Sequence, residues 1–300
     1  MGHDHSHFEA AREGNRKALV VALAITAGIM LLEFFGGLLT NSLALIADSG
    51  HMLSDTVSLA LSLSAIWFAG KAASARKTYG YYRFEIIAAF FNGITLFAMA
   101  GFIVYEAIER FYAPPEVQGS LMLLIAAIGL LANLLSAWVL NRKADVHENL
   151  NMKSAYLHII GDALGSVGAI VAGLLILWFG WNIADPIISV FVALLILKSA
   201  WGILQNSIHI LMEGTPPTID PKEVKLLLEE IDGVVEVHDL HIWTITSGLD
   251  LFTCHMKAEN EADEQELLSQ AIALIHNRYK IEHTTIQIEK SADMHDELKV

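Results

Sequence analysis

Residues 43–69 read LALIADSGHMLSDTVSLALSLSAIWFA, a long apolar stretch that nevertheless contains aspartates and a histidine. About 20 apolar residues in a helix span the hydrocarbon core of a bilayer, so this stretch predicts a transmembrane helix. His51 and Asp55 are four positions apart and therefore lie on one face of that helix. Because a charged side chain in hydrocarbon is costly unless it is paired or lines a cavity, this face predicts a functional site.

A second stretch repeats the pattern: residues 158–162 read HIIGD and place His158 and Asp162 at the same spacing. If the two helices face each other, they supply four ligands, and zinc prefers four-coordinate sites of His nitrogen and carboxylate oxygen. Two carboxylates also neutralise a divalent cation in a medium of low dielectric constant. The structural alternative is polar packing between helices.

Six apolar stretches are long enough to cross a bilayer. They cover residues 18–39, 43–69, 86–107, 121–140, 155–179 and 187–205. Ten lysines and arginines lie before the first stretch, between the second and third, and between the fourth and fifth, whereas the opposite loops contain only Arg110. By the positive-inside rule we expect a multi-pass protein of the cell membrane with both termini cytoplasmic.

The composition divides the chain into parts. Only 17% of the residues are charged, against about 25% in soluble domains, and most of the net charge of −14 lies after Thr215. We expect a cytoplasmic tail over residues 1–17, a transmembrane domain over 18–214 in the lipid bilayer, and a cytoplasmic domain over 215–300. The acidic last part argues against nucleic acid as a partner, because phosphate binding needs clustered Lys and Arg.

The last part predicts the order α-β-β-α-β. Asp220 and Pro221 are the N-cap and first residue of a helix that reaches residue 231, with Gly233 after it. Alternation predicts strands over 234–246 and 249–257, a helical period follows over 263–279, and the last strand covers 284–289.

A second cluster of metal-binding residue types falls on these strands. His238, His241 and His255 lie on the first two strands, and Glu289 ends the last. Adjacent strands would bring such side chains together, which predicts a metal site in the cytoplasmic domain. The alternative is that they are solvated or core histidines.

Other polar residues are less specific. Glu33, Asp48 and Asn92 lie inside predicted spans, where they either line a water-filled path or make satisfied contacts between helices. Asp185 is expected at the membrane interface. The N-terminal residues 3–7, HDHSH, either collect metal or form an incidental polar tail.

Several motifs together resemble the cation diffusion facilitator family, in its zinc-type branch. The segments that carry the resemblance are 41–55 (NSLALIADSGHMLSD), 79–85 (YGYYRFE), 158–162 (HIIGD) and 237–243 (VHDLHIW). The resemblance covers nearly the whole chain. It implies an all-α six-helix membrane bundle, a ferredoxin-like α+β cytoplasmic domain, a homodimer, and alternating access driven by protons.

The resemblance also implies roles for particular residues. It assigns the transport site to His51, Asp55, His158 and Asp162, and His51 favours zinc, with cadmium or cobalt, over manganese. Some relatives carry a histidine-rich metal site in the loop between the second and third spans, but residues 71–85 contain no histidine, which puts such a site in doubt. Arg83 and Glu213 match a pair that, in some relatives, joins at the dimer seam.

These observations predict an exporter of divalent metal ions that exchanges zinc for protons. One rival is an intramembrane zinc hydrolase, but the His-Glu-x-x-His motif is absent and four protein ligands leave no position for an activated water. We therefore expect no enzyme activity. The other rival is a membrane-bound zinc sensor or storage protein, which would bind zinc and move none.

Overall fold

The computed structural model describes residues 23–68, 74–143, 150–246 and 248–290. The chain forms two compact units. The first comprises residues 1–71 and 88–204, and the second comprises 72–87 and 205–300. The N-terminal histidines, for which the sequence left metal binding and an incidental polar tail as alternatives, lie outside the described residues.

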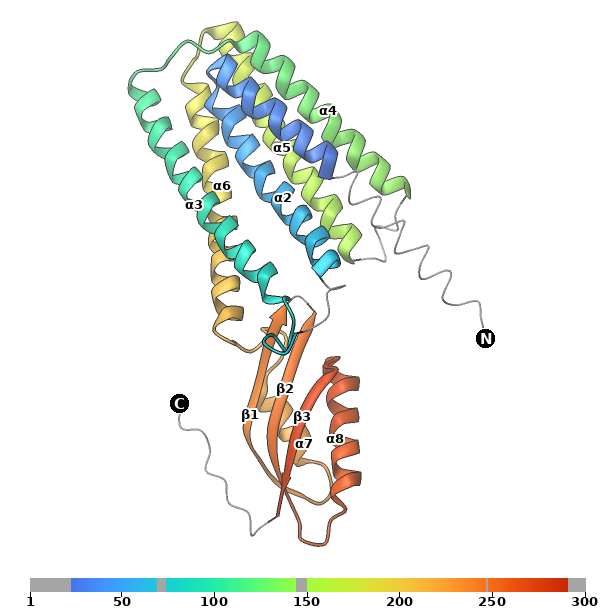
Figure 1. Cartoon of the computed structure of the whole chain (residues 1–300). Coiled ribbons are helices and arrows are strands. Elements are labelled where there is room, and N and C mark those ends of the chain that lie inside the picture. Colours follow the sequence, from blue (N-terminus) through green and yellow to red (C-terminus); the bar gives the residue numbers. More distant parts are fainter. Residues whose placement is uncertain (1–22, 69–73, 144–149, 247, 291–300) are drawn as a thin grey trace. The chain divides into compact units, whose positions relative to one another are not determined.

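The first unit is helical (Figure 1). Its helices cover Leu23–Thr40, α2 Leu43–Phe68, α3 Arg83–Tyr112, α4 Gly119–Lys143, α5 Leu150–Phe179 and α6 Ala184–Leu211, of which α3 and α6 continue into the second unit. Four of these helices contain a described stretch that is long and apolar enough to cross a membrane, namely Leu23–Thr40, α3, the part of α5 from Asp162, and α6. The prediction of a multi-pass membrane domain is confirmed, while the number of six spans stays a prediction.

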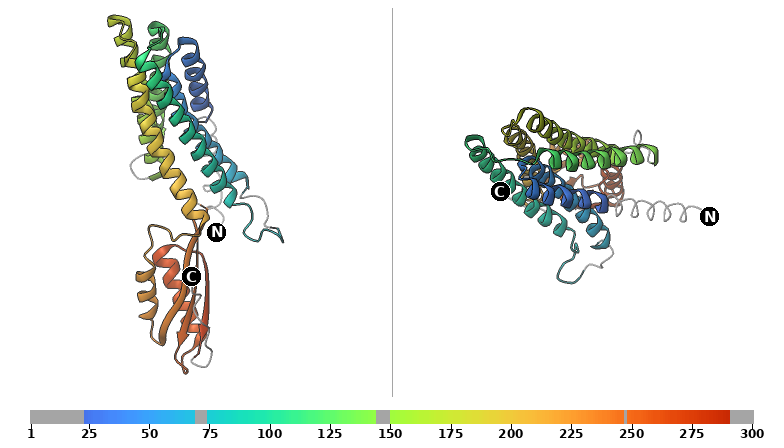
Figure 2. Two further views of the ribbon diagram at one scale, coloured as in Figure 1. Left: turned by 90° about the vertical axis from the view of Figure 1, so that its left-hand side faces the viewer. Right: turned by 90° about the horizontal axis from the view of Figure 1, so that it is seen from above.

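Helix α2 lies between two groups of helices. Its residues Leu43 and Ala47 pack in an apolar cluster with α3 and α6, and Ala44 and Leu45 pack in another with α4 and α5. Figures 1 and 2 show the helices running side by side as a bundle. Because α2 is packed on both sides, its polar residues Asp48 and Ser54 are buried inside the bundle, and His51 is partly buried there.

The outer surface of the bundle is apolar. Large side chains such as Phe35, Leu131 and Phe191 are more than half exposed. A soluble protein rarely exposes so many large apolar groups together, whereas lipid tails cover them without cost. This surface therefore faces lipid.

The second unit contains a three-stranded sheet with two helices. The elements are α7 Pro221–Glu229, β1 Val234–Thr246, β2 Leu249–Ala258, α8 Glu264–Tyr279 and β3 His283–Glu289. Strands β1 and β2 are antiparallel and β2 and β3 are parallel. The predicted order α-β-β-α-β is confirmed. A complete ferredoxin-like fold has a further strand, which the described residues do not contain.

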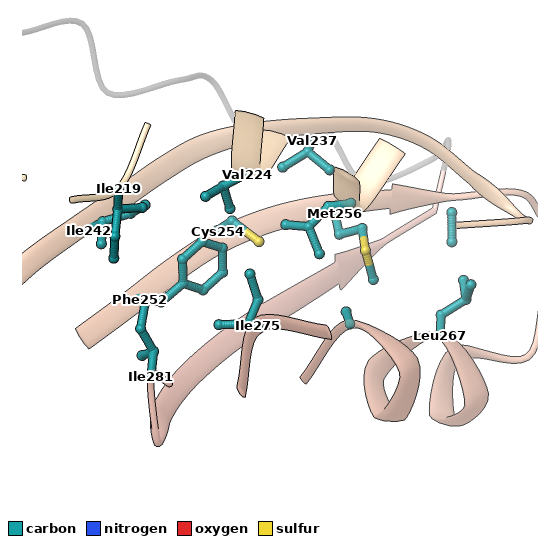
Figure 3. Packing of buried hydrophobic residues seen from close by; sticks show 13 residues of the cluster. Ile219, Val224, Val237, Ile242, Phe252, Cys254, Met256, Leu267, Ile275 and Ile281 are labelled. Carbon is teal, nitrogen blue, oxygen red and sulfur yellow. The ribbon is translucent and has the colours of Figure 1, made fainter. Parts of the chain in front are cut away.

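The core of this unit lies on one face of the sheet. Phe252, Cys254 and Met256 alternate along β2 and point toward α7 and α8, where Ile275 packs against them (Figure 3). Because successive side chains of a strand point to opposite faces, Thr253 and His255 belong to the other face. The sheet thus leaves one face free of the apolar core, and that face carries the histidines.

Candidate metal sites

The first candidate site joins α2 and α5. The Nε2 atom of His51 lies 3.6 Å from Oδ1 of Asp162, and the Asp162 side chain is only 5% exposed. Two ligands about 2.1 Å from a tetrahedral zinc ion lie about 3.4 Å apart. The two atoms are therefore close to the separation that shared coordination requires.

The other two predicted ligands belong to the same helices. Asp55 is one turn beyond His51 on α2, and His158 is one turn before Asp162 on α5. Their side chains lie outside what the structure describes. The backbone positions nevertheless put each on the helix face that its described partner occupies.

Small residues let α2 and α5 approach. A Cβ atom added to Gly165 of α5 would overlap Oδ1 of Asp48 on α2. Ala169 and Ala172 continue the contact along α5 and are almost fully buried. Close approach of helix backbones at small residues is common in membranes. It brings His51 within reach of Asp162.

Asp185 has a role that the sequence did not indicate. It is fully buried, and its carboxylate accepts hydrogen bonds from Ser42 Oγ at 2.6 Å, Leu43 N at 2.7 Å and Ala44 N at 3.1 Å. The first backbone N–H groups of a helix have no partner within the helix. Asp185, at the start of α6, therefore caps α2 from a distant part of the chain.

The second candidate site lies on the outer face of the sheet. His255 Nδ1 is 2.8 Å from Oε1 of Glu289, and His238 Nε2 is 3.4 Å from Oε2 of the same residue. One ligand atom from each of the three residues lies within 4.8 Å of the others. His238 and His255 are paired across β1 and β2, which explains why their rings meet. Three donors at this spacing can hold a divalent cation.

The structure does not place His241 in this group. Its Nε2 atom instead lies 3.1 Å from Oδ1 of Asp239, whose Oδ2 is 3.8 Å from His255. The register shifts between His238 and His241, and Asp239 has a positive φ of 49°. Asp239 thereby links His241 to the three-residue cluster. The sequence analysis missed Asp239, although its position between two histidines in residues 237–243 was a signal.

The second unit has two further features that bear on the sequence predictions. Burial raises the pKa of the Cys254 thiol to about 12, which disfavours the thiolate that binds metals. The lone cysteine faces the apolar core and is not a ligand of either candidate site.

Arg83 Nη2 donates a hydrogen bond of 2.8 Å to Oε1 of Glu213, so the expected pairing occurs within one chain.

Comparison with known proteins matches both parts of the chain to one family. Residues 19–212 match the cation efflux transmembrane domain, and residues 216–291 match the cytoplasmic domain of cation efflux proteins. The chain therefore belongs to the cation diffusion facilitator family, in its zinc branch.

Similar proteins match along almost their whole length. The cadmium, cobalt and zinc/H(+)-K(+) antiporter of Bacillus subtilis is 47% identical over 99% of this chain and 94% of its own. The zinc transporter ZitB of Escherichia coli is 44% identical over 96% and 93%. The metal cation efflux system protein CzcD of Cupriavidus metallidurans is 41% identical over 96% and 90%. These relatives are transporters and not enzymes.

Proposed function

We propose that this protein exports zinc, and also cadmium or cobalt, from the cytoplasm in exchange for protons. The observation that carries the proposal is the approach of His51 Nε2 to Asp162 Oδ1, at 3.6 Å, between two buried helices. The names of the relatives, which include zinc transport and proton-linked antiport, support it. Zinc is the substrate of this site and protons are the counter-ion.

The proposed cycle uses competition between zinc and protons. With the site open to the cytoplasm, zinc binds His51, Asp55, His158 and Asp162, which must be deprotonated. The bundle then rocks so that the site opens outward. Histidine titrates near physiological pH, so a higher proton activity outside displaces the metal. The protonated carrier returns to the inward state.

The proposal includes an arrangement in the membrane. Six spans place both termini in the cytoplasm of a cell-membrane protein, with domain boundaries at residues 17 and 214. The distribution of lysine and arginine over alternate loops supports this orientation. Four protein ligands leave no position for a metal-bound water, which supports transport rather than hydrolysis.

The sheet of the second unit holds a regulatory metal site in this account. His238, His255 and Glu289 are its ligands, and Asp239 connects it with His241. The face that carries them lies opposite the apolar core, where a second copy of the chain has access to it. We propose a homodimer that joins through this domain, as the resemblance implies.

A zinc sensor or storage protein is the alternative function. Such a protein would need the same ligands and would bind zinc without moving it. The buried position of Asp162 favours transport, because an ion bound between membrane helices is far from both solutions and needs a conformational change to leave. Flux measurements separate the two functions.

The experiment is zinc flux into proteoliposomes under an imposed pH gradient, with an internal pH indicator. We expect Asp162→Asn to reduce zinc-driven proton flux more than about 100-fold, because loss of even a second-shell partner of a metal ligand costs 10–100-fold. The matched control is His276→Ala, which removes an exposed residue of α8 and should leave flux unchanged.

Two results would contradict the proposal. Zinc binding by the wild type with no flux would make the protein a sensor or a store. Unchanged flux in a folded Asp162→Asn variant would remove Asp162 from the transport site.

A further inference from the structure

Glu33 is a buried carboxyl that the transport site does not use. It lies on the helix Leu23–Thr40 and is 0% exposed. Neither of its oxygens has a hydrogen-bond partner among the described residues. A buried ionised carboxylate without a partner is very costly, whereas a neutral carboxylic acid is far cheaper to bury. Its position therefore requires an explanation.

The surrounding helices make room for this carboxyl. A Cβ atom added to Gly129 of α4 would overlap Oε1 of Glu33, and the same Cβ would lie 3.4 Å from Ser166 Oγ of α5. Glycine at this point of α4 thus leaves space for Glu33 beside Ser166. A packing contact alone would favour an apolar side chain here.

A second buried carboxyl, Asp48, lies between Glu33 and the proposed metal site. Ser166 Oγ donates a hydrogen bond of 3.4 Å to Oδ2 of Asp48, and Gly165 leaves space for Oδ1 of the same residue. Asp48 is 2% exposed and lies one turn before His51 on α2. Ser166 lies one turn after Asp162 on α5. Polar groups therefore continue from Glu33 toward the transport site.

The titratable groups around Glu33 carry mostly negative charge. Asp48 of α2 and Asp162 of α5 are close enough to act on it electrostatically. His51 reaches the same region through Asp162, and residues 119–141 of α4 contain no titratable side chain. The side chains of Asp55 and His158 lie outside the described residues. Three carboxylates cannot all stay charged in an apolar bundle without a cation or a proton.

We propose that Glu33 carries one of the exchanged protons, at a position next to the metal site rather than on a metal ligand. When the site faces outward and is empty, a carboxylate oxygen of Glu33 takes one proton from the external solution and forms an O–H bond. When zinc enters from the cytoplasm, its two positive charges favour the carboxylate, the O–H bond breaks, and the proton leaves to the cytoplasm. Glu33 thereby removes one of the two charges that zinc adds.

The inference rests on the proposed function. The experiment distinguishes failure of the inference from failure of the proposed function. Purified protein is titrated with zinc in weakly buffered detergent solution, and an indicator reports protons released per zinc bound. Because Glu33 holds a single proton, we expect Glu33→Gln to bind zinc but to release about one proton fewer per zinc than the wild type. Proteoliposomes should show the same decrease in protons exchanged per zinc.

The matched control is Asp185→Asn. It also neutralises a buried carboxyl of the bundle, but one that is hydrogen-bonded at the start of α2, and it should leave the proton-to-zinc ratio unchanged. An unchanged ratio in Glu33→Gln overturns the inference while the proposed function stands. If Glu33→Gln changes the dependence of zinc transport on potassium but not the number of protons exchanged per zinc, the inference is overturned as well. Glu33 would then bind a potassium ion rather than a proton. Absence of zinc flux in the wild type overturns the proposed function instead.

If Glu33→Gln does not fold, a measurement on the wild type still tests the inference. Infrared difference spectra with and without zinc should show the loss of a protonated carboxyl C=O band when zinc binds. If no such band disappears, no carboxyl releases a proton and the inference is wrong.

Discussion

Glu289 is almost fully buried at the end of β3, yet each of its carboxylate oxygens lies beside a different histidine. A bound divalent cation would compensate its charge. Metal affinity at this site should therefore depend on Glu289 more than on either histidine alone, because its carboxylate lies beside both of them.

Removal of this carboxylate should weaken zinc binding by the second unit. We expect Glu289→Gln to abolish one class of bound zinc or to lower its affinity at least tenfold, because second-shell changes alone cost 10–100-fold. Calorimetric titration of the full chain measures the number and affinity of bound zinc ions. Glu282→Gln changes an exposed residue of the same segment and should have no effect. Equal zinc binding by Glu289→Gln and the wild type would show that these three residues hold no metal.

The four residues of the proposed transport site could be grouped from the sequence because a helix places positions i and i+4 on one face, whatever surrounds it. The approach of His51 to Asp162 depends on how α2 and α5 pack against each other. The spacing of residues along one helix carries no information about that packing. Asp239 was missed for a different reason. A register shift and a positive φ at that residue break the alternation from which strand faces are predicted.

At the scale of elements, the N-terminus of α2 depends on a residue 142 positions away. The Asp185 carboxylate accepts three hydrogen bonds there and also lies 4.0 Å from Arg110 Nη1. The contact fixes the start of α2 against the start of α6.

Asp185→Asn should therefore destabilise the bundle. An amide is a weaker acceptor than a carboxylate, and hydrogen bonds to charged groups contribute about 1.5–3 kcal/mol to stability. We expect a lower midpoint in thermal unfolding of the detergent-solubilised protein. Asp220→Asn, at the exposed cap of α7, is a suitable comparison and should have a smaller effect, since an asparagine cap is nearly as good as aspartate. Equal midpoints for Asp185→Asn and the wild type would mean that the cap adds no stability.

Most elements could be predicted because their signals are local. The strand β1 begins and ends at the predicted residues 234 and 246, and α7 begins one residue after its N-cap, Asp220. Helices α3 to α6 extend beyond the predicted spans: α6, for example, continues to Leu211 rather than ending at residue 205. The length of an apolar stretch reflects the thickness of the hydrocarbon core of the bilayer. A helix can continue beyond that core into the polar region as long as its backbone hydrogen bonds are satisfied.

At the scale of the whole molecule, charge and function are divided between the two units. The membrane unit is apolar outside and holds buried carboxylates and a histidine inside, whereas the second unit carries most of the net charge of −14. An acidic cytoplasmic surface attracts divalent cations to the side from which they are exported. The proposed function needs both units, and its chemistry depends on the membrane unit.

In the proposed function, side chains of α2 and α5 replace the water shell of one zinc ion. X-ray absorption spectroscopy of zinc tests it most directly, in a His255→Ala/Glu289→Gln variant that lacks the second site. The account predicts four neighbours at about 2.0–2.2 Å, with the scattering of two imidazole rings and no sulfur. A six-coordinate shell of oxygen alone, or one without imidazole scattering, would contradict it.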